Sequence, residues 1–223
     1  MSSSKKFDIA DLLRDPGAFV AEAKEAGGFG RLVAFLATLT LVGTSLFGFA
    51  LGAFVNAPGA FADWRVVALD GLKLPGIVAF AFVLCYPTLY VFACISGSRL
   101  SAARLLGLGL VSTATLGCLL AALAPILWLF AVSTESIGFI VIFASTLGAF
   151  ALAFASRPFG QAVAKGVVAS AAGLKVWFAI FIIVALQAIT LVRPMLTAAD
   201  APREPEGKCF FLRHFAKTVF EAN

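Results

Sequence analysis

Residues 105–132 read LLGLGLVSTATLGCLLAALAPILWLFAV, a run without one Asp, Glu, Lys, Arg or His. An α-helix rises about 1.5 Å per residue and the hydrocarbon core of a bilayer is about 30 Å thick, so about 20 apolar residues cross it. The stretches 31–56, 74–95, 136–156 and 174–192 are also free of charge except near their ends. The sequence therefore predicts an all-α protein, a polytopic transmembrane helical bundle of about five spans.

The composition is typical of a membrane domain. Of the 223 residues, 61% are hydrophobic and 13% are charged, whereas soluble domains average about 45–50% and about 25%. We expect a cytoplasmic amphipathic N-terminal segment over 1–28, a five-helix transmembrane domain over 29–197, and a C-terminal extramembrane tail over 198–223 with a short amphipathic helix. The bundle would then carry peripheral amphipathic helices at both ends.

The connections between the predicted spans indicate the topology. Residues 57–73 are predicted to form a longer loop in which Trp64 is an interfacial anchor, and residues 133–135 a tight turn. Lys and Arg are somewhat more frequent on the side of the N-terminus, and the 133–135 turn contains neither. Because cytoplasmic loops carry an excess of Lys and Arg, we expect a multi-pass protein with its N-terminus in the cytoplasm and its C-terminus outside.

Two prolines and a few polar side chains mark a candidate site inside the predicted spans. A proline has no N–H to donate, so Pro87 and Pro125 each leave one helix carbonyl without its usual partner. Such breaks are either packing kinks or parts of a pathway through the membrane. The candidate intramembrane polar and kink site comprises Tyr86, Pro87, Thr88, Tyr90, Pro125 and Gln187. We interpret Gln187 as a hydrogen-bonding residue between helices rather than a substrate ligand.

Two further sets of residues are candidates for association. Gly48 and Gly52 form a small-xxx-small pattern in the first predicted span, which permits close helix approach within the chain or between copies. Apolar side chains outside the spans are candidate partner-docking residues: Phe7, Leu12, Leu13, Phe19, Phe211 and Phe215. A lipid surface or a protein groove would bury these side chains equally well.

The residue types that catalysis needs are missing from the predicted spans. His214 is the only histidine and lies in the tail, so the spans have no His-based metal site and no Ser–His relay. The spans hold no paired carboxylates, and no Gly-rich phosphate-binding pattern occurs. The four cysteines show no paired spacing, and the net charge of +5 is scattered. We therefore predict a protein that is not an enzyme, with no metal, no cofactor and no nucleic-acid partner.

Several short motifs together resemble a known group of proteins. They are LLRDP at 12–16, KLP at 73–75, YPTLYVF at 86–92, GSRLS at 97–101, LAPI at 123–126 and VRP at 192–194. As a set they resemble an uncharacterised family of small five-span bacterial inner-membrane proteins, itself distantly similar to the Yip family, which has adaptor roles in membrane trafficking. The resemblance implies a five-helix domain in the bacterial inner (plasma) membrane, a cytoplasmic N-terminus and no catalytic residues.

The missing chemistry, the amphipathic ends and the resemblance predict a non-catalytic membrane protein that anchors, scaffolds or helps to assemble a partner complex. Its partners would be the lipid bilayer and a protein, either a different chain or further copies of itself. The alternative is an oligomeric channel or small-solute permease that uses the kinks at Pro87 and Pro125. Apolar side chains filling the bundle would favour the first hypothesis, and a continuous cavity lined by Thr and Tyr the second.

Overall fold

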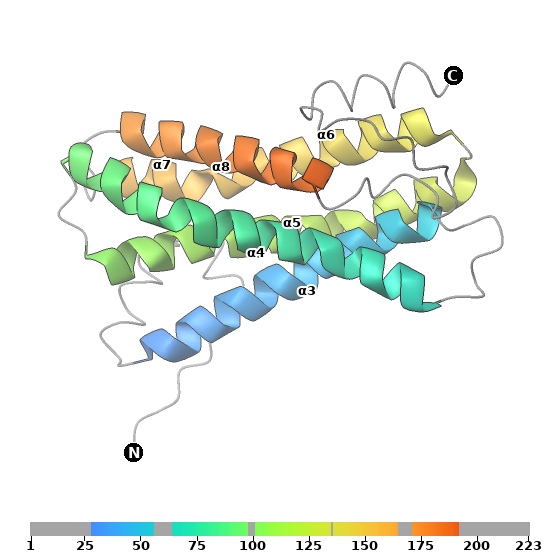
Figure 1. Cartoon of the computed structure of the whole chain (residues 1–223), viewed down its shortest axis with the longest axis horizontal. Helices are drawn as coiled ribbons and strands as arrows, with labels where there is room; N and C mark the ends of the chain where they lie inside the picture. Colours follow the sequence, from blue (N-terminus) through green and yellow to red (C-terminus); the bar gives the residue numbers. More distant parts are fainter. Residues whose placement is uncertain (1–27, 56–63, 98–100, 135, 165–170, 192–223) are drawn as a thin grey trace.

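The computed structural model describes residues 28–55, 64–97, 101–134, 136–164 and 171–191. Figure 1 shows the six helices of this part of the chain: α3 (Phe29–Val55), α4 (Trp64–Ile95), α5 (Ala102–Ser133), α6 (Ile137–Ala155), α7 (Arg157–Ala164) and α8 (Ala171–Leu191). These described residues contain no strand. The predicted all-α class is therefore confirmed for them.

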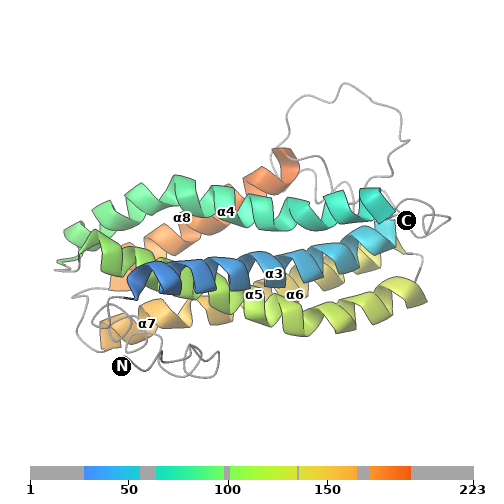
Figure 2. The ribbon, with the colours of Figure 1, turned by 90° about the horizontal axis from the view of Figure 1, so that it is seen from below.

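The long helices lie side by side and alternate in direction, as Figures 1 and 2 show. α3 packs on both α4 and α5, α8 lies against α4, and α6 lies against α5. α7 follows α6 after the single residue Ser156 and contacts both α5 and α8. α3 and α5 share the most extensive contact of any pair of described helices, and α5 also contacts α4, α6 and α7.

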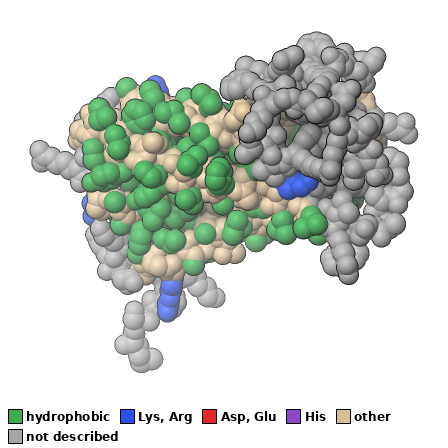
Figure 3. Space-filling model, viewed as in Figure 1, with side chains coloured by type: hydrophobic (Ala, Val, Ile, Leu, Met, Phe, Trp, Pro, Cys, Tyr) green, Lys and Arg blue, Asp and Glu red, His purple; other side chains and the backbone are tan. Residues whose placement is uncertain are grey.

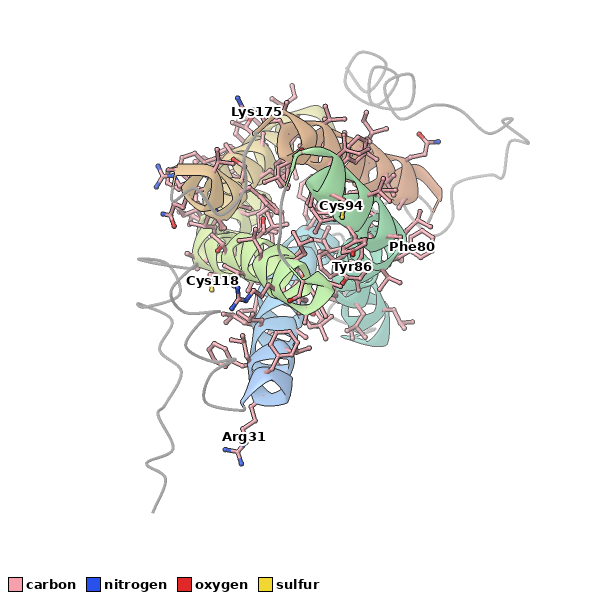
Figure 4. The ribbon with its side chains drawn as sticks, turned by 90° about the vertical axis from the view of Figure 1, so that its left-hand side faces the viewer. Arg31, Phe80, Tyr86, Cys94, Cys118 and Lys175 are labelled. Atoms are coloured by element: carbon pink, nitrogen blue, oxygen red, sulfur yellow. The ribbon has the colours of Figure 1, made fainter. Side chains whose placement is uncertain are left out.

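One end of the bundle carries most of the positive charge in the described part of the chain. α3, α5 and α8 begin at this end, and α4 and α6 finish there. Four cations belong to these helix termini: Arg31, Arg104, Arg157 and Lys175. Figure 4 looks onto this end and shows Arg31 and Lys175 pointing away from the bundle. We call it the basic end.

The helices have the length and composition of membrane spans. Four segments are long and apolar enough to cross a bilayer: Phe29–Phe54, Val67–Ile95, Ala102–Ser133 and Gly138–Gln161. α8 is a further apolar helix of 21 residues. Large hydrophobic side chains cover the outside of the bundle (Figure 3), and Val83 and Val132 are 71% and 72% exposed. Because lipid is the solvent that suits such a surface, this is the architecture of a multi-pass membrane protein.

Apolar side chains also fill the interior, in two clusters along the bundle. The cluster at the basic end joins α3, α4, α5 and α8, and its Leu36, Leu89 and Val111 are completely buried. The second cluster lies toward the opposite end and includes Leu127 and Ile140, also completely buried. Lipid tails are as apolar as leucine, so these side chains stabilise the bundle mainly through close packing.

The structure corrects the start of the second span. The sequence predicts a loop over 57–73 with Pro75 opening the helix, but α4 begins at Trp64 and contains Pro75 in its interior. Hydropathy marks the part of a helix that lies in hydrocarbon, whereas charged residues near a helix end remain in the interface without ending the helix. Asp70 and Lys73 therefore mark where the apolar span begins, whereas the helix itself begins earlier, at Trp64.

The predicted amphipathic ends lie outside the described residues, apart from residue 28 at the boundary of the first segment. The same holds for the candidate docking residues Phe7, Leu12, Leu13, Phe19, Phe211 and Phe215. Their roles stay predictions.

Candidate functional site

The polar cluster around Pro87 lies on the outer side of α4. Pro87, Thr88 and Tyr90 are exposed, and α4 continues without a break through Pro87. The Thr88 hydroxyl donates to the carbonyl of Cys85 in the same helix, at 2.7 Å. Tyr86, labelled in Figure 4, is half-buried, and its hydroxyl donates to the carbonyl of the first residue of α5 at 3.0 Å. These contacts stay within α4 or hold it to α5.

The other two residues of the predicted polar site lie elsewhere. Pro125 is exposed on α5, which is also continuous through its proline. Gln187 is half-buried near the end of α8. Trp177 of α8 contacts α4 at Cys85, and Gln187 lies ten residues further along the helix, which is about 15 Å at helical rise. The structure therefore does not bring the six candidate residues together.

The buried hydroxyls of the interior already have partners. Five polar residues are buried in the described part of the chain, and each donates to a backbone carbonyl: Thr40, Thr44, Ser112, Thr113 and Thr115. Thr40 and Thr113 also meet each other across the α3–α5 contact, with their hydroxyl oxygens 3.3 Å apart. Ser112 bonds to the carbonyl of the last residue of α6. These groups stabilise the helices and their contacts.

Glycines set the closest helix approaches. A Cβ added to Gly48 would lie 2.6 Å from the carbonyl oxygen of Gly71, so the backbones of α3 and α4 almost touch there, and Gly52 is buried on the same helix. One added to Gly43 would overlap the carbonyl of Gly117, where α3 crosses α5. Gly48 thus packs against a helix of its own chain. The predicted small-xxx-small pair does not include Gly43. The sequence does not indicate which helix faces this glycine, so its contact with α5 could not be predicted.

Trp177 links α8 to α4 through a hydrogen bond. No sequence pattern predicts this contact. Its side chain is 1% exposed, and its indole Nε1 donates to the carbonyl of Cys85 at 2.7 Å. The indole ring packs against Phe159 and Phe181, with ring centroids 5.3 Å and 5.6 Å away. A buried tryptophan needs an acceptor for its N–H. A tryptophan within an apolar span is therefore the one sequence feature that could have indicated an interhelical hydrogen bond here.

A groove opens at the basic end between α7 and α8. Its volume is about 260 Å³, and seven residues line it: Ser156, Phe159, Gly160, Val163, Leu174, Lys175 and Phe178. Most of this lining is apolar, and the exposed Lys175 supplies its one cation. The Ser156 hydroxyl donates to the carbonyl of Ala153 at 2.7 Å. The groove combines an apolar interior with a positively charged rim.

The described residues form no group of three His, Cys, Asp or Glu side chains that could hold a metal ion. Three cysteines in this part of the chain are free thiols: Cys85 is buried, Cys94 is exposed and Cys118 is half-buried. Cys209 lies outside the described residues. The described residues therefore offer three features for a functional role: a packed bundle, a lipid-facing surface and the groove at the basic end.

Comparison with known proteins adds no relative: no family model, curated protein or solved structure matches the chain.

Proposed function

We propose that the protein is a non-catalytic integral membrane protein that anchors or scaffolds a partner complex. The observation that carries this proposal is the interior of the described bundle, where two apolar clusters pack between the helices and the five buried hydroxyl side chains each donate to a helix carbonyl. Ion-coupled carriers place Asp, Glu, Lys, Arg or His at membrane depth, and the two interior clusters contain none of these residues. The proposal also agrees with the resemblance of the short motifs to a family of small five-span bacterial proteins, which is itself distantly similar to the Yip family with its adaptor roles.

The alternative function, an oligomeric channel or small-solute permease, draws little support from the two prolines. Pro87 and Pro125 lie on the outer sides of continuous helices. A pathway that used them would have to run between copies of the chain, because both prolines face away from the bundle interior.

We further propose that the basic end faces the cytoplasm of a bacterial cell and that the membrane is the inner membrane. Four cations belong to the basic end, whereas α4 contributes Arg65 and Lys73 near the opposite end. The excess of Lys and Arg on the cytoplasmic side supports this orientation. α3 would then enter the membrane from the cytoplasm, in agreement with the expected cytoplasmic N-terminus.

The partner is proposed to dock on the apolar residues of the two chain ends. A side chain of this kind contributes about 1.5–3 kcal/mol when it is fully buried. The six residues together would contribute about 9–18 kcal/mol, which is comparable with or above the cost of association of about 4–15 kcal/mol. The residues concerned are Phe7, Leu12, Leu13, Phe19, Phe211 and Phe215.

Co-purification tests this proposal. The full-length protein is extracted under gentle conditions, and its bound proteins are compared with those of variants lacking residues 1–26 or 203–223. At least one deletion should release the partner, while the remaining bundle still inserts and stays monodisperse. A milder variant, Phe7→Ser with Leu12→Ser, keeps the charges of the N-terminal segment and should weaken the same contact.

Flux into proteoliposomes distinguishes the two functions. The scaffold proposal expects no solute flux from the wild-type protein above that of empty liposomes. If neither deletion releases any bound protein, or if a reproducible flux is measured, the scaffold proposal is wrong.

A further inference from the structure

The shape of the α7–α8 groove suits a single flexible chain. Its floor is formed by Phe159 and Phe178, whose ring centroids are 6.1 Å apart, and Val163 and Leu174 complete the apolar lining. Its volume of about 260 Å³ lies below the roughly 300–1,000 Å³ of pockets that enclose compact small molecules. The groove therefore fits part of an acyl chain better than a folded ligand.

Gly160 is an exposed residue of the groove lining. A Cβ added to this glycine meets no atom within 4 Å, so a larger side chain fits at this position without a clash. Phe159, another lining residue, lies edge-on against the buried Trp177. The groove is therefore backed by packed aromatic rings and accepts a substitution at residue 160.

The segment that forms the groove carries positive charge only. Residues 156–191 contain Arg157, Lys165 and Lys175 and no Asp or Glu. Lys175 lines the groove and is exposed. Arg157 begins α7, and its guanidinium carbon lies 3.7 Å from the centroid of the Phe154 ring, so this cation is held at the same end of α6. Basic pockets between membrane helices favour anionic headgroups.

The position of the groove agrees with this charge. It lies where a membrane-spanning helix finishes and the next one begins, at the level of the basic end. In a bilayer this level is the boundary between acyl chains and headgroups. A phospholipid at this depth would place its phosphate beside Lys175 and one chain between α7 and α8.

We propose that the groove between α7 and α8 binds one anionic phospholipid, with an acyl chain along Phe159 and Phe178 and the phosphate at Lys175. A zwitterionic phospholipid offers the same chain but no net charge. One nearby cation should favour binding of the anionic lipid over the zwitterionic lipid by roughly fivefold. The site is independent of the proposed scaffold role.

Trp177 provides a reporter for the test. The full-length protein carrying Trp64→Phe and Trp128→Phe is reconstituted in nanodiscs, which leaves Trp177 as the single tryptophan beside the groove. Fluorescence quenching is measured with phosphatidylglycerol or phosphatidylcholine whose acyl chains are brominated. We expect the anionic lipid to quench Trp177 at a several-fold lower mole fraction than the zwitterionic lipid.

Two substitutions test separately the contact with the lipid headgroup and the contact with the acyl chain. Lys175→Gln should bring the anionic-to-zwitterionic ratio close to one, whereas Lys73→Gln near the opposite end should leave it unchanged. Gly160→Leu adds a large side chain to the groove lining and should reduce quenching by both lipids. Gly148→Leu is its matched control, because a Cβ at Gly148 also meets no atom within 4 Å but lies outside the groove.

The proposal is overturned by any of three results: equal quenching by both lipids in the parent protein, an unchanged ratio in Lys175→Gln, or quenching in Gly160→Leu equal to that in Gly148→Leu. The first two would mean that the basic rim selects no headgroup. The third would mean that the bromine atoms reach Trp177 from general lipid outside the groove.

Discussion

Replacing Gly117 by alanine should destabilise the bundle, because this glycine lies at the crossing of α3 and α5. A Cβ at this position would lie 2.9 Å from both the Leu39 carbonyl oxygen and the Thr40 Cα, whereas ordinary contact begins at 3.4 Å. The two obstructing atoms belong to the backbone of α3 and have no rotamer through which to move aside. The helices must therefore separate by about half an ångström.

The change in the free energy of unfolding has two destabilising contributions and one that offsets them. Overpacking of a close contact costs about 1–3 kcal/mol. The separation also lengthens the Thr40–Thr113 hydroxyl contact, which is already 3.3 Å, and an interhelical hydrogen bond in a membrane contributes about 0.6 kcal/mol. Alanine offsets part of this loss, since it stabilises a helix by about 1 kcal/mol relative to glycine.

The matched control is Gly148→Ala on α6, where an added Cβ meets no atom within 4 Å. Both variants gain the same helix propensity, so the difference between them isolates the steric cost of about 1–3 kcal/mol. Gly43→Ala should be at least as destabilising as Gly117→Ala, because its Cβ would overlap the carbonyl of Gly117.

The free energy of unfolding is measured by titrating the purified protein in mixed micelles with sodium dodecyl sulfate, followed by circular dichroism. Gly117→Ala should unfold at a clearly lower fraction of the denaturing detergent than Gly148→Ala. Equal stability of these two variants would refute the close α3–α5 contact and the reasoning built on it.

Three further predictions concern single residues. Trp177→Phe should lower the free energy of unfolding by about 1–2 kcal/mol, because the Cys85 carbonyl loses its interhelical donor and a smaller ring fills the site; an unchanged detergent titration would contradict this. Pro87→Ala restores a backbone N–H on the exposed side of α4 and should leave the bundle as stable or slightly more stable, and proteoliposomes of both proteins should show no flux. In a variant without native cysteines, a membrane-impermeant thiol reagent applied to intact cells should label Glu135→Cys and miss Ser101→Cys; the opposite pattern would reverse the orientation.

The sequence by itself determines the membrane spans. A helix in hydrocarbon must satisfy its backbone internally and expose apolar side chains, and both requirements are local. For this reason the uncharged runs locate α3, α5, α6 and α8 to within a few residues, but they miss the short helix α7 and the interfacial turns of α4 between Trp64 and Lys73. These runs contain no histidine, so the sequence also excludes a histidine-based site within them.

Only the tertiary structure decides which helices meet and which faces they use. In a membrane protein the lipid-facing and inward-facing sides of a helix are both apolar, so the periodicity that identifies the buried face of a soluble helix is weak. Pro87 and Tyr90 stand out in the sequence yet lie on the outer side, whereas Gly43 and Trp177 stand out little yet set the contacts of α3 with α5 and of α8 with α4. The Trp177–Cys85 hydrogen bond joins residues 92 positions apart, and the α7–α8 groove is lined by residues of both helices. Such contacts depend on how whole helices pack, and no local pattern encodes that arrangement.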